Sequence, residues 1–224
     1  MKKFFLVLLS LFILFSVKAK ELELRKIYVD GTEEVLLLDD NTDTIVLYSS
    51  DANSKEVKDI IGLNQFKNLK ILDIPMLRYN GDWQFLAGLT TVRILGFSSD
   101  SEKLKSIKFL ESLTSLETLD CKLLIREEYK ESFLSEKIDL RNLKNLKNIY
   151  YKCRIWKNDS SGWYYLGRIP NFINVKNKPI LDLNNNGIEY LTSREKKMLK
   201  QYSEVNFYSN PITNNKKTKW WNLT

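Results

Sequence analysis

Apolar residues recur through the middle of the chain with a spacing that changes inside each unit. Four stretches place apolar residues three apart and then close with a step of two. A step of three puts side chains on one face of a helical or 3-10 turn, and a step of two puts them on one side of a strand. The four sets are Leu63, Phe66, Leu69, Leu72 and Ile74; Leu86, Leu89, Val92, Leu95 and Phe97; Leu110, Leu113, Leu116, Leu119 and Cys121; and Leu140, Leu143, Leu146, Ile149 and Tyr151. Each unit predicts a turn followed by a short strand, both facing one core.

Two C-terminal segments share a different spacing. Leu181, Leu183, Asn186 and Ile188 stand at relative positions 0, +2, +5 and +7, and Val205, Phe207, Asn210 and Ile212 repeat them. This pattern predicts a short strand with two inward residues, a turn around a buried structural Asn (Asn186 and Asn210), and an apolar residue that returns to the core.

The L-x-L-x-x-N-x-I segment, present twice, resembles the leucine-rich repeat, most closely the type found in bacterial internalin-like surface proteins. Equivalent strand positions Leu72, Leu95 and Leu119 lie 23 and 24 residues apart, within the range of about 20–29 for this repeat. The resemblance covers residues 44–213 and implies an α/β fold, a right-handed leucine-rich repeat solenoid shaped as a horseshoe or arc, with a parallel β-sheet on its concave side. A bundle of amphipathic helices is the alternative, and the change of period within every unit argues against it.

The early repeats depart from the family pattern. The position of the turn Asn holds Ser50, Leu77, Asp100, Leu124 and Arg154 instead. The backbone polar groups of those turns need other partners, so we expect the early repeats to be less regular.

The ends of the chain carry separate segments. Residues 20–43 alternate apolar and charged positions around Asp30-Gly31, which predicts an N-terminal β-hairpin that caps the first repeat, whose strand begins at Thr44. Residues 214–224 form a basic tail with the pair Trp220-Trp221, which either covers the last repeat or contacts another surface.

Two units are longer than the rest. The stretch Ile125–Lys137 predicts an added helix on the convex side. The stretch Trp156–Tyr165 contains Asn-Asp-Ser-Ser-Gly, a turn-forming run, and predicts a loop or hairpin that projects Trp156, Trp163 and Tyr164 from the convex side.

Residues 1–19 have the features of a cleaved signal peptide. Lys2 and Lys3 precede an apolar run shorter than the roughly 20 residues of a membrane-spanning helix, and Val17 and Ala19 suit cleavage after Ala19. A retained anchor is the alternative. Cleavage removes three lysines and no acid, so the formal net charge falls from +7 to +4. We therefore expect a secreted, periplasmic or cell-surface protein with no stable membrane span, and little tendency to bind nucleic acid.

The chemistry that the sequence offers is limited. The chain has no His, which excludes His-based catalytic triads and His-ligated metals. Cys121 and Cys153 are predicted to be buried thiols rather than a disulfide, because they lie diagonally in neighbouring strands. The segment Asp182–Gly187 matches the start of a calcium loop, but Ser193 stands where such a loop needs Glu, so we predict no metal and no cofactor.

The repeat frame assigns the residues that flank the inward ones to the concave face. We predict partner binding by Tyr48, Asp73, Asp120, Lys122, Tyr150, Lys152, Asp182, Asn206 and Tyr208, with the convex loop as the alternative site. Asp73, Asp120, Tyr150 and Asp182 fall in one column, where Gly96 leaves room for a partner.

These features favour a non-catalytic, monomeric module that binds a protein at a host or bacterial surface, since Tyr and carboxylates on a rigid sheet suit protein recognition. An envelope-associated scaffold that binds anionic surfaces through its basic tail is the main alternative. A glycosidase that uses Asp120 and Asp182 is the third hypothesis, disfavoured because these acids are two repeats apart on an open face.

Overall fold

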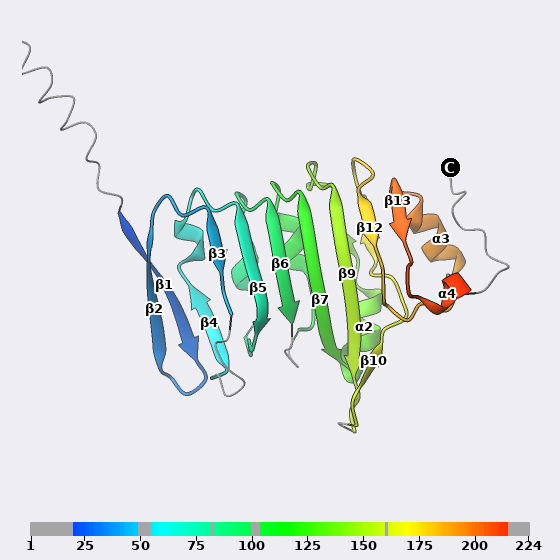
Figure 1. Ribbon diagram of the computed structural model, residues 1–224, viewed down its shortest axis with the longest axis horizontal. Helices are drawn as coiled ribbons and strands as arrows, with labels where there is room; N and C mark the ends of the chain where they lie inside the picture. The colour runs from blue at the N-terminus through cyan, green and yellow to red at the C-terminus, as the bar shows by residue number, and fades with distance from the viewer. Residues whose placement is uncertain (1–19, 49–54, 82, 100–103, 160, 215–224) are drawn as a thin grey trace, which may run out of the picture.

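The computed structural model describes residues 20–48, 55–81, 83–99, 104–159 and 161–214. The predicted signal peptide, residues 1–19, and the tail from residue 215 onward, with Trp220-Trp221, lie outside these ranges. The described chain is mostly strands with few helices (Figure 1).

An antiparallel hairpin begins the described chain. Strands β1 (Glu21–Tyr28) and β2 (Glu33–Asp39) pair in register from Glu21 with Asp39 to Ile27 with Glu33. In the turn, Gly31 adopts a φ of 82°, a conformation open to glycine at little cost. A strand that the sequence did not predict, β4 (Val57–Ile61), pairs antiparallel with β1, so the hairpin belongs to a three-stranded sheet in the order β2-β1-β4.

Seven parallel strands form the main sheet, and they lie beside one another in chain order (Figure 1). They are β3 (Thr44–Val46), β5 (Ile71–Leu77), β6 (Ile94–Ser99), β7 (Thr118–Arg126), β9 (Asn148–Trp156), β12 (Ile180–Asp182) and β13 (Glu204–Asn206). An eighth strand, β10 (Trp163–Tyr165), pairs antiparallel with β9. This order is consistent with an α/β repeat solenoid.

The connections between strands cover one face of the sheet, as Figure 1 shows. They contain the 3-10 turns η1 (Leu63–Gln65), η2 (Trp83–Leu86), η3 (Lys108–Ser112) and η4 (Glu127–Tyr129), the helices α2 (Lys130–Ser135), α3 (Ser193–Leu199) and α4 (Pro211–Asn214), and the short parallel pair β8 (Ile138–Asp139) and β11 (Phe172–Ile173). The other face of the main sheet carries no element of the described chain, and we call it the open face.

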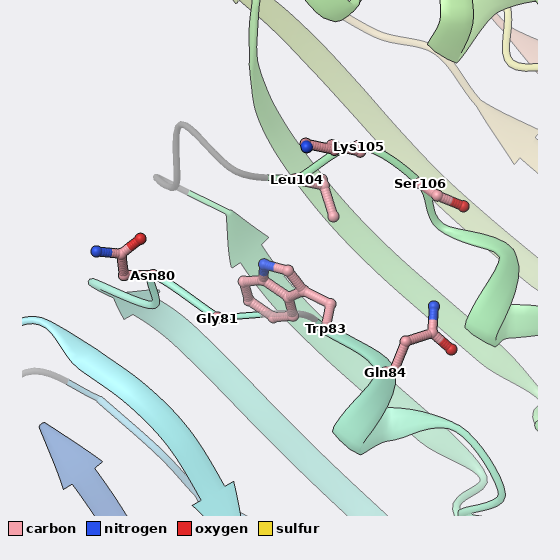
Figure 2. A pocket seen from close by; sticks show the side chains of 7 residues that line it. All are labelled: Asn80, Gly81, Trp83, Gln84, Leu104, Lys105 and Ser106. Atoms are coloured by element: carbon pink, nitrogen blue, oxygen red, sulfur yellow. The ribbon is translucent and has the colours of Figure 1, made fainter. Parts of the chain in front are cut away.

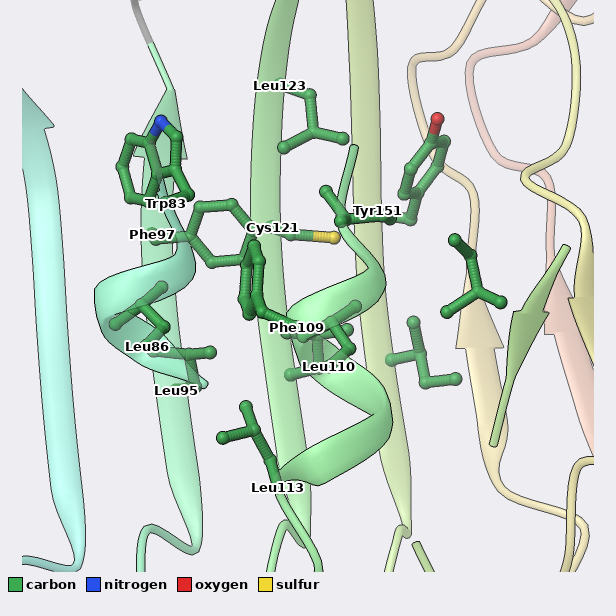
Figure 3. Close-up of a cluster of buried hydrophobic side chains, with 14 of the residues drawn as sticks. Trp83, Leu86, Leu95, Phe97, Phe109, Leu110, Leu113, Cys121, Leu123 and Tyr151 are labelled. Atoms are coloured by element: carbon green, nitrogen blue, oxygen red, sulfur yellow. The ribbon is translucent and has the colours of Figure 1, made fainter. Parts of the chain in front are cut away.

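The four apolar sets predicted from the sequence are all buried. The core lies between the sheet and its connections, where the aromatic rings of Trp83, Phe97 and Phe109 pack one against the next, with ring centroids 5.3 and 5.6 Å apart (Figure 3). Cys121 and Cys153 are free and buried, as predicted. Burial raises the pKa of the Cys153 thiol to about 12.

Asn186 and Asn210 occupy buried turns, each only 1% exposed. The Asn186 amide donates to the carbonyls of Tyr151 and Leu183, at 2.7 and 2.9 Å, and its Oδ1 accepts from the Cys153 N–H. Asn210 Nδ2 donates to Leu183 O at 2.8 Å, and its Oδ1 accepts from the Asn186 N–H. Both side chains therefore hydrogen-bond backbone groups of the buried turns in which they lie.

The prediction of turns at Leu124 and Arg154 was wrong. Both residues lie inside strands, because β7 and β9 continue to pair through Leu124 with Arg154 and on to Arg126 with Trp156. Leu77, at another position that lacks the Asn, likewise lies in β5. Without an Asn side chain to satisfy a turn, ladder hydrogen bonds satisfy the backbone instead. Ser50 and Asp100 lie outside the described residues.

The added helix predicted over Ile125–Lys137 is shorter than expected. Ile125 belongs to β7, and the helical part comprises η4 and α2, residues 127–135. It lies on the covered face of the sheet, where its Phe133 is buried.

Candidate binding surface

The parallel register places the predicted binding residues on the open face. Successive strands align Val46, Asp73, Gly96, Asp120, Tyr150, Asp182 and Asn206 in one row across the sheet. Neighbouring strand positions such as Leu119 and Cys121 are buried, which shows that the row points away from the core. We call this row the central column.

Further predicted residues flank the central column. Lys122 pairs in register with Lys152, two residues beyond the pair of Asp120 and Tyr150. Tyr48 and Tyr208, which follow β3 and β13, are 58% and 78% exposed. The register therefore brings the carboxylates, Tyr150 and the two lysines together on adjacent strands, and places Tyr48 and Tyr208 at opposite ends of the sheet.

The free space expected at Gly96 is occupied. A Cβ atom built on Gly96 would lie 2.5 Å from Asp73 Oδ1. The Asp73 carboxylate therefore leans over the glycine, and the small residue makes room for a neighbouring side chain of the same protein rather than for a partner.

The carboxylates of the central column already have local partners. Asp120 forms an ion pair of 3.2 Å with Lys122, and Asp182 accepts hydrogen bonds from the Asn184 N–H and Nδ2 at 2.9 and 3.1 Å. Tyr150 stands between these two acids in the column. The acids are thus two strand spacings apart, about 10 Å, with a tyrosine between them.

The hairpin formed by β9 and β10 lies differently from the prediction. Instead of projecting from the convex side, it extends the main sheet beyond its other strands (Figure 1). Cross-strand partners in a sheet share a face, so Trp163 opposite Trp156, and Tyr165 opposite Arg154, lie on the open face. The two candidate surfaces are therefore parts of one continuous surface.

Tyr164 is the exception in that hairpin. It pairs with the buried Ile155, so it points to the covered face, where its hydroxyl donates a 2.9 Å hydrogen bond to Glu127. Burial, followed by this contact, raises the pKa of Tyr164 to about 12. Tyr164 fixes the hairpin to the η4 turn, and it is not part of the exposed surface.

A hollow of about 370 Å³ lies where the open face meets the hairpin. Its lining combines basic and aromatic side chains, namely Lys122, Lys152, Arg154, Trp156 and Trp163, with Ser98, Ser99, Leu123 and Leu124. We call it the basic–aromatic hollow. The Arg154 guanidinium lies 3.9 Å from the Trp163 ring centroid, which is within the range of a cation–π contact.

Arg154 and Tyr165 also belong to this surface, and neither was predicted to lie on it. Arg154 was assigned to a turn, which hid the fact that it continues the alternation of Tyr150 and Lys152. Extending that alternation as far as Trp156 would have placed it on the open face.

A second hollow, of about 390 Å³, lies on the covered side of the sheet (Figure 2). Trp83, Gln84 and Leu104 contribute to its lining together with Asn80, Gly81, Lys105 and Ser106. Residues 82 and 100–103, which adjoin this lining in the chain, lie outside the described residues. We therefore assign the hollow no role.

Within the described ranges, no group of three or more Cys, Asp or Glu residues is placed to hold a metal ion. The partial calcium motif at Asp182 serves the turn, since its carboxylate oxygens accept the hydrogen bonds from Asn184.

The chain matches no protein-family model and no curated protein. Among solved structures it is similar to an internalin from Listeria monocytogenes, with 13% sequence identity over 78% of this chain and 71% of that chain, and a TM-score of 0.24. At this TM-score the two structures overlap only in part, so the evidence for stacked repeats is the register of this chain's own sheet.

In the part of the chain that the structure describes, no helix has the length and apolar character needed to cross a membrane.

Proposed function

We propose that this chain is an exported, non-catalytic leucine-rich repeat protein that binds a protein partner through the open face of its parallel sheet. The observation that carries the proposal is the concentration of exposed large side chains on that face. Val46, Tyr48, Ile94, Tyr150, Trp163 and Tyr208 are all between 42% and 78% exposed. Exposed apolar and aromatic side chains on one regular face are typical of an interaction site.

The geometry suits recognition of a folded or extended protein. Parallel strands lie about 4.8 Å apart, so each row presents a fixed series of side chains that loses little conformational entropy on binding. Tyrosine and tryptophan bury a large area with few rotatable bonds, which makes them frequent contributors to binding energy. The carboxylates of Asp120 and Asp182 on either side of Tyr150 add polar specificity.

A capture experiment tests the proposal. The purified chain is immobilised and exposed to surface extracts of the producing cell and of host cells, and the captured protein is identified by mass spectrometry. Replacing Asp120, Tyr150 and Asp182 together by Ala should weaken capture of that protein at least tenfold, because the replacements remove the centre of the surface.

The matched control removes two acids and one tyrosine elsewhere. Glu56, Tyr190 and Glu131 are exposed outside the open face, and their replacement by Ala should leave capture unchanged. Urea unfolding of each variant shows that it is folded. If the central-column variant is folded and captures the same protein as well as the parent chain does, the proposal is wrong.

A further inference from the structure

The basic–aromatic hollow has an excess of positive charge. Lys122 and Lys152 lie directly opposite each other on neighbouring strands, an arrangement in which like charges repel. Asp120 forms an ion pair with Lys122, but no carboxylate of the described residues forms an ion pair with Lys152 or Arg154. The lining thus carries three cations against one neighbouring acid, and an anion placed there would relieve the repulsion.

Aromatic contacts orient the Arg154 side chain so that it can bind such an anion. Its guanidinium stacks on Trp163 at 3.9 Å and lies 5.8 Å from the Tyr165 ring, and the two rings pack edge to face, 5.4 Å apart. Its Nε is buried and has no hydrogen-bond partner within the described structure. Stacking fixes the plane of the guanidinium and leaves its N–H groups, which lie in that plane, to meet a carboxylate with two parallel hydrogen bonds.

From this geometry we infer that the basic–aromatic hollow binds an acidic segment of the protein partner, with one carboxylate on Arg154 and a second near Lys122 and Lys152. The inference rests on the proposed function and specifies the chemistry of the partner. Arginine and tryptophan at the centre of a hollow are the residue types that contribute most to protein–protein affinity. The positive charge also steers an acidic segment toward the sheet.

The probe for this inference is a fluorescein-labelled hexaglutamate peptide, measured by fluorescence anisotropy against the purified chain at several salt concentrations. Binding should saturate and should weaken as salt is added, because the contacts are ionic. An uncharged peptide of Gly and Ser should not bind.

Substitutions of Arg154 distinguish the contribution of the planar guanidinium from that of its positive charge. Arg154→Lys keeps the charge but loses the planar two-point contact, so hexaglutamate affinity should fall about tenfold. Arg154→Gln should lower it at least as much. Lys144→Gln removes the same charge from an exposed position outside the hollow and should change affinity less than twofold.

A second substitution guards against loss of folding. Lys152 lies 5.8 Å from the Tyr165 ring and makes no stack on Trp163, so Lys152→Gln removes a cation and leaves the 3.9 Å stack of Arg154 on Trp163 in place; it should weaken hexaglutamate binding while the urea midpoint stays unchanged. The inference is overturned if Arg154→Lys binds hexaglutamate as the parent chain does, or if Lys144→Gln weakens binding as much as Arg154→Gln. It is also overturned if dextran sulfate binds in an Arg154-dependent way and hexaglutamate does not, since the site would then be one for a polyanionic polysaccharide.

The two proposals fail separately. If partner capture is insensitive to the central-column variant, the proposed function is wrong, whatever the peptide does. If capture depends on the central column but hexaglutamate binding does not depend on Arg154, only the acidic-segment inference is wrong.

Discussion

Replacement of Asn186 by Ala should destabilise the fold far more than the loss of one small side chain suggests. The side chain satisfies Tyr151 O, Leu183 O and Cys153 N, at distances of 2.7 to 3.0 Å in a site that is 1% exposed. Strand β12 ends at Asp182, so the Asn186 amide supplies the hydrogen bonds to β9 that a longer β12 would supply.

The size of the loss in unfolding free energy depends on which buried backbone groups lose their hydrogen-bond partner. Leu183 O keeps its 2.8 Å hydrogen bond from Asn210, so Asn186→Ala removes the side-chain partner of two buried groups, Tyr151 O and Cys153 N. Each unsatisfied buried group costs roughly 1–3 kcal/mol. The free energy of unfolding should therefore fall by about 2–6 kcal/mol, and Tm by about 4–24 °C for a chain of this length.

Urea unfolding followed by far-UV circular dichroism and tryptophan fluorescence measures this change, with an unchanged m-value as the check that the same transition is observed. Asn145→Ala, at an exposed turn, is the control and should stay within about 0.5 kcal/mol of the parent chain. A loss below about 1 kcal/mol in Asn186→Ala would refute the reasoning, since it would mean that the two backbone groups find other partners.

The shared carbonyl of Leu183 makes the two asparagines interdependent. Either single replacement by Ala leaves Leu183 O one side-chain donor, and the double replacement leaves it none. The double variant should therefore lose more stability than the sum of the single variants, by about 0.5–3 kcal/mol. Additive losses would show that the shared carbonyl does not couple them.

Two further predictions concern a turn and an ion pair. Gly187→Ala should cost about 1–3 kcal/mol in urea unfolding, because Gly187 has a φ of 66° and a Cβ there would lie 2.6 Å from the Tyr165 Cβ. Hydrogen bonds from Arg93 and Lys147 lower the pKa of Glu117 to about 2, so its contribution is complete above the unfolded pKa of about 4.3 and is lost as the pH falls toward 2. Glu117→Gln should flatten the decline in stability between those pH values, and an unchanged decline would contradict the assignment.

The register of the main sheet could be predicted from the sequence because it depends on local spacing. A step of two, as from Leu119 to Cys121, fixes which side chains face the core, and a shift by one residue would expose them all. The same reasoning placed Asp120, Tyr150 and Asp182 in one row. The turn asparagines could be predicted because a buried amide at that spacing has a specific hydrogen-bonding task.

Other features depend on partners distant in the chain or on signals that were overlooked. The pairing of β4 with β1 is a long-range contact with no local signature. Helix α3 does have one, since Thr192 and Glu195 form a capping box in which Thr192 Oγ1 accepts from the Glu195 N–H. The position of Asp73 over Gly96 depends on a side-chain conformation that spacing does not determine.

The missing asparagines explain where the proposed binding surface acquires its charge. At Asn186 the amide ends the pairing and turns the chain, whereas at Leu124 and Arg154 no amide is present and β7 and β9 continue as a nine-residue pair. That continuation carries Arg154 and Trp156 onto the open face and gives β10 a strand edge on which to fold back. Departure from the repeat pattern thus produces the stacked arginine of the basic–aromatic hollow. Arg154→Asn should accordingly remove both the proposed anion contact and the stacking on Trp163, and acrylamide quenching of the chain's tryptophan fluorescence would detect the second effect as an increase in the exposed fraction.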